Sequence, residues 1–280
     1  MKIGLIAGSG ALPHHVIEGA QASGYEVSII TFKGMTSPDI FSRPAKAFGI
    51  AELGGVVKYF KRANCTHICM AGGVARPDFS SLKPDMKGLK YLPGALAAAK
   101  RGDDSLLSYM ISAFEKEGFG IVSPQEICKS LLIGEGHMGA VHMTKAHRDD
   151  ALKACEIARQ MGALDIGQGA IVCSGLVLAV EAQEGTDAML ERVANLPKDK
   201  RGSTTRRCGV FAKLVKPGQE DRVDLPTIGP KTIELADKAG LSGIIVESGR
   251  AFCLDQDACV AAADEAGLFI VGMPAASEGA

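Results

Sequence analysis

Apolar runs alternate with helix-like segments through the first half of the chain. Lys2–Ala7 predicts a buried strand, and Gly8-Ser9-Gly10 then turns the chain into a helix that ends near Gly24. Further strands are predicted at Tyr25–Phe32, His67–Ala71 and Phe119–Val122, and helices at Val56–Ala63 and, with an interruption at Gly102, at Gly94–Glu117. This alternation predicts an α/β fold in which a mostly parallel sheet carries helices on both faces.

The pattern changes at Leu131–His147, which contains three glycines, three histidines and little periodicity. Five-residue spacing does not place His137, His142 and His147 on one helix face, so we interpret the segment as a linker and not as a zinc site. Beyond it, apolar runs on both sides of Ser174-Gly175 predict a β-hairpin. The remaining predicted helices are Asp149–Met161, Asp187–Leu196, Lys231–Ala239 and Gln256–Ala266, and the strands are Gly209–Val215, Gly243–Val246, Phe252–Leu254 and Leu268–Val271.

These patterns predict two domains, as the length of 280 residues also suggests at about 150 residues per domain. We expect residues 1–130 to form a Rossmann-like, doubly wound parallel sheet. We expect residues 131–147 to be the linker, and residues 148–280 to form a mixed α/β (α+β) domain that carries the catalytic residues.

Composition and charge exclude several classes of protein. A hydrophobic content of 46% and a charged content of 22% rule out disorder for most of the length. The 31 Lys and Arg residues balance 32 Asp and Glu residues, so the whole chain offers no electrostatic case for binding nucleic acid. No apolar segment reaches the ~20 residues of a membrane span, and the N-terminus lacks the pattern of a signal peptide. We therefore expect a cytoplasmic protein whose eight cysteines, none in a CxxC pair, are buried free thiols.

Two loops of the first half could hold an anion. Gly8-Ser9-Gly10 lies between a strand and a helix, where backbone N–H groups favour a phosphate, although Pro13 replaces the third glycine of the dinucleotide fingerprint. A tight turn without a ligand remains an equal alternative. Gly72-Gly73 and Arg76 follow the next strand, and Arg76 could hold a phosphate or pair with Asp78.

Acidic and basic residues could also bind ligands. Asp103 and Asp104 start a helix, where one could cap the helix and the other bind a divalent cation. In the second half, Lys213 and Arg222 precede Asp224 and Thr227 in a loop framed by two prolines. Such clusters suit phosphoryl chemistry, while a solvated charged loop is the alternative that composition alone favours. Neither a Walker A loop nor a GxSxG nucleophile elbow occurs.

Five segments together resemble the LpxI family, the UDP-2,3-diacylglucosamine pyrophosphatases of lipid A biosynthesis. The segments extend over nearly the whole chain in the family's order: Ile6–Pro13, Ala71–Phe79, Asp165–Gly169, Ala179–Met189 and Arg222–Gly229. The resemblance implies hydrolysis of UDP-2,3-diacylglucosamine to UMP and 2,3-diacylglucosamine 1-phosphate with the help of Mg²⁺. It also implies two domains with the substrate held between them, in a Gram-negative cytoplasm. Peripheral contact with the inner membrane and a homodimer are left open.

The resemblance also assigns roles to residues. The family's critical aspartate corresponds to Asp224, and Lys213 and Arg222 could compensate the charge of the diphosphate beside it. Asp224 would orient water or bind the metal, for which Asp103 and Asp104 are the other candidate ligands. Gly73 stands where some relatives are expected to carry a polar residue. The expected substrate-binding residues are Gly8, Ser9, Gly10, Ala11, Leu12, Gly73, Arg76, Gln168, Thr186, Asp187 and Thr227.

Two other functions compete with this one. The glycine loop would also suit a Rossmann-type oxidoreductase or sugar-nucleotide transferase. A dinucleotide site of that kind, however, needs an acidic residue after the second strand, where the chain has Thr31-Phe32-Lys33-Gly34. A non-catalytic sensor that binds a UDP-sugar and leaves it intact is the third alternative.

Overall fold

The computed structural model describes residues 1–218, 222 and 224–275, and its contacts divide the chain into two compact units. The first unit contains Met1–Lys129 and the short segment that carries Arg222 and Asp224. The second contains the chain from Ser130 to Gln219 and from Leu225 onward. No helix among the described residues is long and apolar enough to cross a membrane.

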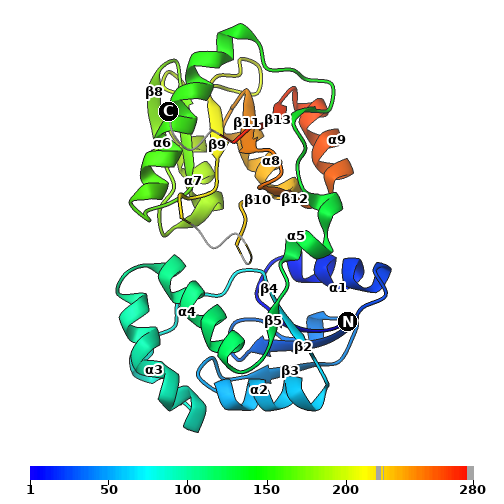
Figure 1. Cartoon of the computed structure of the whole chain (residues 1–280). Coiled ribbons are helices and arrows are strands. Elements are labelled where there is room, and N and C mark those ends of the chain that lie inside the picture. Colours follow the sequence, from blue (N-terminus) through cyan, green and yellow to red (C-terminus); the bar gives the residue numbers. More distant parts are fainter. Residues whose placement is uncertain (219–221, 223, 276–280) are drawn as a thin grey trace. The chain divides into compact units, whose positions relative to one another are not determined.

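The first unit is a five-stranded parallel sheet with the strand order β3-β2-β1-β4-β5. Helix α1 covers one face, and α2 and α4 pack on the other, which confirms the predicted doubly wound layout (Figure 1). The strands are β1 (Lys2–Ala7), β2 (Glu26–Phe32), β3 (Ala45–Phe48), β4 (His67–Ala71) and β5 (Gly120–Ile121). The helices are α1 (Leu12–Ala22), α2 (Leu53–Arg62), α3 (Met86–Ala99), α4 (Asp103–Lys116) and α5 (Pro124–Ile127).

The second unit is built on a six-stranded mixed sheet with the order β6-β13-β11-β9-β7-β8. Its strands are β6 (Gly136–Met138), β7 (Gly169–Cys173), β8 (Leu176–Val180), β9 (Val210–Lys213), β11 (Gly243–Glu247) and β13 (Phe269–Met273). β10 (Thr227–Ile228) and β12 (Phe252–Cys253) form a separate parallel pair. The helices are α6 (Arg148–Ala163), α7 (Gly185–Ala194), α8 (Pro230–Lys238) and α9 (Gln256–Ala266).

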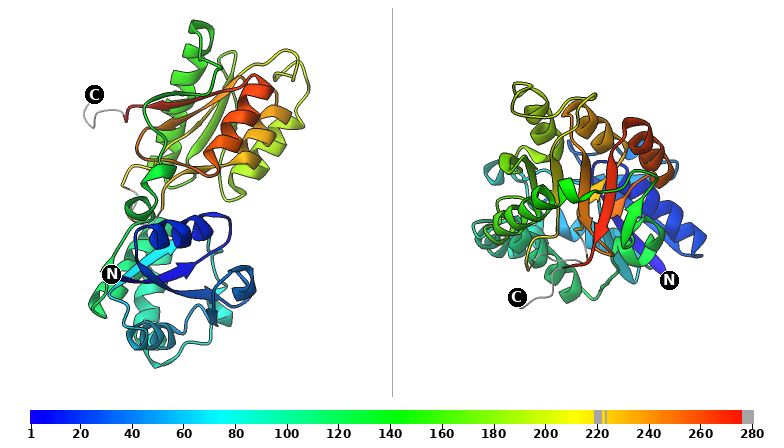
Figure 2. Two further views of the ribbon diagram at one scale, coloured as in Figure 1. Left: turned by 90° about the vertical axis from the view of Figure 1, so that its right-hand side faces the viewer. Right: turned by 90° about the horizontal axis from the view of Figure 1, so that it is seen from above.

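Alternating side chains build a core on each face of this second sheet. Ile171, Phe211 and Ile244 point to the face covered by α7, α8 and α9. Their neighbours Val172, Ala212 and Ile245 pack against α6 on the opposite face. This separation follows from the two-residue period of a strand, and Figure 2 shows helices on both sides of the sheet.

The prediction that residues 131–147 form a linker is wrong, because β6 lies in this segment and pairs with β13 as an edge strand of the second sheet. The histidines that we assigned to that linker have structural contacts. The rings of His137 and His142 stack at 4.4 Å, and His137 Nε2 accepts the N–H of Met143 at 3.0 Å. His147 packs against Phe269, and burial lowers its pKa. Because β6 contains few apolar residues, it has no apolar–polar alternation by which the sequence could predict a strand.

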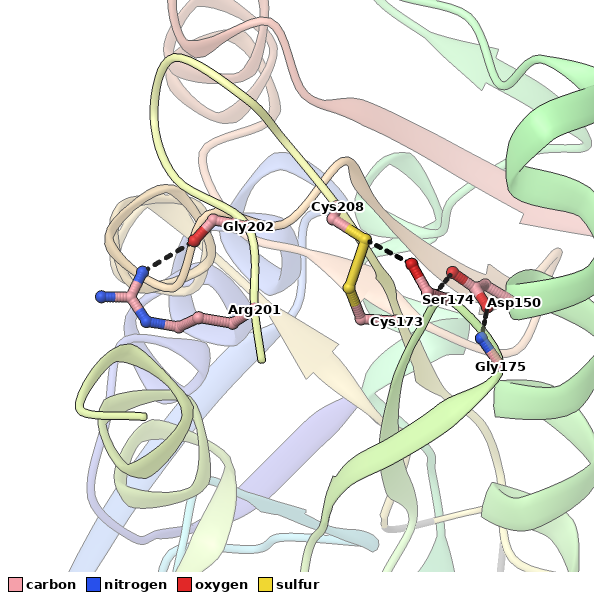
Figure 3. Close-up of a disulfide and its surroundings, with 7 residues drawn as sticks. All are labelled: Asp150, Cys173, Ser174, Gly175, Arg201, Gly202 and Cys208. Atoms are coloured by element: carbon pink, nitrogen blue, oxygen red, sulfur yellow. Dashed lines mark hydrogen bonds between the residues drawn. A yellow bond between two sulfur atoms is a disulfide. The ribbon is translucent and has the colours of Figure 1, made fainter. Parts of the chain in front are cut away.

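The expectation that all cysteines are free is also wrong for one pair. Cys173 and Cys208 form a disulfide with their Cα atoms 5.7 Å apart (Figure 3). Cys173 ends β7 and Cys208 comes just before β9, and these two strands pair antiparallel from Val172 and Val210 onward. The two cysteines are 35 residues apart in sequence, so only the strand pairing brings them together.

Candidate active site

Two glycine loops meet at the centre of the first sheet, where β1 and β4 end side by side. The strand order reverses at this pair, and ligands of open α/β sheets bind outside the carboxyl ends of the strands at such a point. Ser9 N donates to Gly73 O at 2.7 Å, and Gly73 N donates back to Ser9 O at 3.0 Å. The structure therefore brings the predicted residues Ser9 and Gly73 together.

The close packing of these loops explains their glycines. A Cβ on Gly8 would lie 2.4 Å from the carbonyl oxygen of Gly73, and one on Gly72 would lie 2.5 Å from that of Ser9. The amides of Gly8 and Ser9 donate to Ala71 O and Gly73 O within the protein. The last part of this loop, Gly10–Leu12, lies at the N-terminus of α1, where a helix dipole favours negative charge.

Arg76 and Asp103 contact each other in the first unit. The Arg76 guanidinium donates to Asp103 Oδ1 at 3.2 Å and to the carbonyl of Ala99 at 2.6 Å, so it links the end of α3 to the start of α4. The alternative pairing with Asp78 does not form, because Asp78 accepts from Ser80 instead. Gly102, and neither of the aspartates, is the N-cap of α4, and Asp103 and Asp104 occupy its first turn.

Arg222 and Asp224 belong to the first unit although they lie far along the chain. Arg222 forms an ion pair with Glu115 of α4 at 3.0 Å. Asp224 is partly buried, whereas the next residues, Leu225 and Pro226, are buried in the second unit. The proline restricts the backbone of Leu225, which helps to define the path of the chain after Asp224.

The second unit places four polar residues along one edge of its sheet. Gln168 precedes β7 and Glu181 follows β8, while Lys213 and Glu247 end β9 and β11. The register makes them neighbours: Glu181 N donates to Gly169 O, Gly169 pairs with Lys213, and Lys213 pairs with Val246. Lys213, Glu181 and Glu247 are each at most 7% exposed.

Buried polar atoms at this edge lack hydrogen bonds within the described part of the protein. They are Gln168 Oε1, Glu181 Oε2 and Glu247 Oε2, the last of which has Arg250 at 3.6 Å. Unsatisfied buried polar groups are rare in folded proteins and often belong to ligand sites. This edge is therefore the part of the second unit best suited to bind a polar substrate.

The other predicted residues of the second unit lie around the same edge. Lys213 Nζ donates to the carbonyl of Thr227 at 2.9 Å, and Thr186 Oγ1 donates to Glu181 Oε1 at 2.6 Å. Asp187 instead forms an exposed ion pair with Lys231 at 2.7 Å. That pair raises the pKa of Lys231.

Sequence analysis did not select Glu181 or Glu247 as site residues. The sequence places Glu181 and Glu184 beside the predicted helix start at Thr186-Asp187, where two glutamates exceed what capping needs, but it gives neither of them a role. A glutamate directly after an apolar strand is the signal that both positions share, because strand ends in such sheets face the ligand side.

Carboxylates could hold a metal here, but they do not form a ready-made cage. Among the residues that the structure describes, no group of three or more His, Cys, Asp or Glu side chains could hold a metal ion. Asp103, one of the expected ligands, is ion-paired with Arg76. Mg²⁺, however, is usually bound through one or two carboxylates together with substrate phosphates and water. Asp224 fits that simpler requirement as an oxygen donor.

The solved structures that this chain resembles have low TM-scores and low sequence identities. A UDP-glucose 4-epimerase from Thermus thermophilus in complex with NAD has a TM-score of 0.27 and 17% identity, over 52% of this chain and 42% of that one. CobK precorrin-6A reductase has a TM-score of 0.32 and 12% identity, over 100% and 90% of the two chains.

Family models and a curated relative match almost the whole sequence. Residues 2–131 match the LpxI N-terminal domain, and residues 134–271 match the LpxI C-terminal domain. A protein of Caulobacter vibrioides named UDP-2,3-diacylglucosamine pyrophosphatase LpxI is 49% identical over 272 residues, which are 97% of either chain. With both domains matched in order and half of the residues identical, the chain belongs to the LpxI family.

Proposed function

We propose that this protein hydrolyses the diphosphate bond of UDP-2,3-diacylglucosamine. The observation that carries the proposal is the 49% identity to the Caulobacter pyrophosphatase over 97% of both chains. Water adds across one P–O–P bridge: its oxygen bonds to one phosphorus, and the bridging oxygen leaves with the other. The products are UMP and 2,3-diacylglucosamine 1-phosphate.

The first unit supplies features that suit the nucleotide part of such a substrate. The Gly8–Leu12 loop and the Gly72-Gly73 loop lie at the point where the strand order reverses, which is the usual nucleotide position in doubly wound sheets. The start of α1 offers N–H groups and a favourable dipole to a phosphate. Arg76, which the sequence predicts to hold a phosphate, also links the end of α3 to the start of α4.

Charged residues suit the chemistry of the diphosphate. Phosphoryl transfer needs positioning and charge neutralisation more than covalent help from the protein. Lys213 is a buried cation, and its bond to Thr227 O limits its freedom. Arg222 is a second cation of the same segment as Asp224. We assign to Asp224 the task of orienting the attacking water or holding Mg²⁺, which would neutralise charge on the diphosphate when bound.

Direct product analysis tests this proposal. The purified protein is incubated with UDP-2,3-diacylglucosamine and Mg²⁺, and UMP and the sugar 1-phosphate are quantified. We expect equal amounts of the two products. Binding of intact substrate without UMP release would instead show a sensor, and a requirement for a nicotinamide cofactor would show an oxidoreductase.

A chelator tests the role of the metal separately. We expect EDTA to abolish UMP release and added Mg²⁺ to restore it, because the candidate ligands are carboxylates, which suit a hard cation. Full turnover in EDTA would show that the reaction needs no metal, and Asp224 would then be assigned to orienting water.

A further inference from the structure

We infer that the exposed face of α3 (Met86–Ala99) is a docking surface for an anionic lipid bilayer. This inference goes beyond the proposed function and does not depend on it. The surface consists of the exposed residues of the helix and the lysine that follows it: Met86, Leu89, Lys90, Pro93, Leu96, Ala97 and Lys100. We call this set the α3 stripe.

The α3 stripe follows the period of a helix. Its members recur at intervals of three or four residues, which places them on one face. Met86 is 84% exposed, Leu89 53% and Leu96 37%. Large apolar side chains that gather on one exposed face, instead of standing singly, mark interaction surfaces.

The opposite side of α3 is fully used in holding the helix on the protein. Tyr91, Ala98 and Ala99 are buried, and α3 packs against α2 and α4. Gly94 lets α4 approach so closely that a Cβ there would lie 2.2 Å from the hydroxyl of Tyr109, which donates to Tyr91 O at 3.0 Å. The α3 stripe therefore points away from the body of its own unit, and Figure 1 shows α3 at the edge of that unit.

Positive charge surrounds the stripe. Lys90 and Lys100 lie within it, and Lys83 and Arg101 flank the helix at its two ends, all of them exposed. A groove of about 510 Å³ beside the N-terminal end of α3 is lined by Lys58, Lys61 and Arg62 of α2 and by Lys87.

Two acidic residues near the N-terminal part of the stripe are hydrogen-bonded or ion-paired, while Asp103 and Asp104 follow Arg101 at its other end. Asp85, directly before α3, accepts the N–H groups of Gly54, Gly55 and Gly88. Glu117 pairs with Lys87 and lies 3.9 Å from Lys61. The surface around the N-terminal part of the stripe thus keeps an excess of positive charge.

An apolar helix face bordered by lysines fits a membrane surface better than a protein groove. Such helices lie in the plane of the bilayer, with apolar side chains among the acyl chains and cations at the headgroups. Each Lys or Arg near an anionic surface adds to the attraction. An apolar protein partner would leave the lysines of the stripe without counter-charge.

Vesicle binding tests the assignment. The full chain is floated with vesicles of phosphatidylcholine alone or mixed with phosphatidylglycerol, without any substrate. We expect binding to the mixed vesicles, weakened by high salt because screening reduces surface attraction. The variant Met86→Ser/Leu89→Ser/Leu96→Ser should bind at least about tenfold more weakly, since it lacks the three large apolar side chains that enter the acyl region. Lys90→Glu/Lys100→Glu should also lose binding to the anionic vesicles.

The matched control is Leu152→Ser/Leu164→Ser/Leu176→Ser, which removes three exposed leucines of the second unit and should bind like the unchanged protein. Single variants such as Leu89→Ser replace the triple variant if its circular dichroism shows a loss of fold. Equal binding by the stripe variants, or equal binding to neutral and anionic vesicles, would overturn the inference. So would a change from dimer to monomer in the stripe variants, which would make a second copy the occupant.

Discussion

The buried ammonium of Lys213 donates to the carbonyl oxygen of Thr227 at 2.9 Å. Lys213 ends β9 in the main sheet of the second unit, and Thr227 begins β10 of the small two-stranded sheet. The bond joins two residues that we had selected separately from the sequence. It also fixes the position of a cation that is only 7% exposed, at the sheet edge where Glu181 and Glu247 lie.

We expect Lys213→Met to lower UMP release by about two powers of ten or more, which is typical for the loss of a preorganised charge. The substitution also leaves Thr227 O without this donor, so we expect the free energy of unfolding to fall by about 1–3 kcal/mol. Turnover and urea denaturation are measured on the same sample. Lys238→Met, which removes a surface lysine paired with Glu234, should leave turnover unchanged. Normal turnover of Lys213→Met would remove Lys213 from the mechanism.

Asp224→Ala should lower turnover by about two or more powers of ten, because the variant lacks the carboxylate that orients water or binds metal. Substrate should still bind, since the glycine loops, Lys213 and Arg222 are unchanged. UMP release and binding of intact UDP-2,3-diacylglucosamine are measured in parallel, with the exposed Asp199→Asn as control. If the variant loses both substrate binding and its fold, Asp224 is a structural residue.

Glu181→Gln keeps the size of the side chain and an acceptor for Thr186 Oγ1, but removes a buried negative charge. Glu181 Oε2 has no hydrogen bond within the described residues, so the substitution breaks no such bond at that atom, and the bond from Thr186 Oγ1 to Oε1 is kept. We expect turnover to fall about tenfold or more, while the melting temperature changes little. Glu191→Gln on the exposed side of α7 is the control. A large loss of stability with normal turnover would contradict this role.

The pH dependence of stability should reflect Asp85. Burial by itself raises the pKa of Asp85, but the N–H groups of Gly88, Gly55 and Gly54 outweigh it and hold the pKa below its usual value. The stabilisation is therefore present above pH ~3.9, the pKa of an unfolded aspartate, and is lost as pH falls through the folded value.

Asp85→Asn tests this directly by urea denaturation. At neutral pH the variant should be about 1–3 kcal/mol less stable than the unchanged chain, because it loses charge-assisted bonds to backbone N–H groups. The difference should shrink in acid, where Asp85 of the unchanged chain becomes protonated. A difference that stays constant down to acid pH would show that the charge of Asp85 is not responsible. Asp199→Asn should show no difference at either pH.

Reduction of the Cys173–Cys208 disulfide should destabilise the second unit. The bridge spans 35 residues of sequence, for which the chain-entropy relation gives about 3–4 kcal/mol. We expect a reductant to lower the denaturation midpoint of the unchanged chain. The double variant Cys173→Ala/Cys208→Ala should have the denaturation midpoint of the reduced chain, with or without reductant. In Cys155→Ala, by contrast, a reductant should still lower the midpoint. Equal midpoints of the oxidised and reduced chain would contradict the prediction.

Local sequence patterns determined much of this architecture. The apolar runs of β1, β2 and β4 are long enough to stand out, and the apolar runs on both sides of Ser174-Gly175 predicted the β7–β8 hairpin. In the structure both turn residues adopt positive φ angles. Family resemblance located Asp224 and the glycine loops, since those motifs are contiguous in sequence.

Features that depend on pairing between segments far apart in sequence became visible only in the tertiary structure. β3 and β6 are short and gain their place only by hydrogen bonding to β2 and β13. The disulfide and the polar row from Glu181 through Lys213 to Glu247 exist because strands far apart in sequence lie in register at one sheet edge. Sequence periodicity predicts which face of a strand a residue occupies, but long-range packing sets strand order and register.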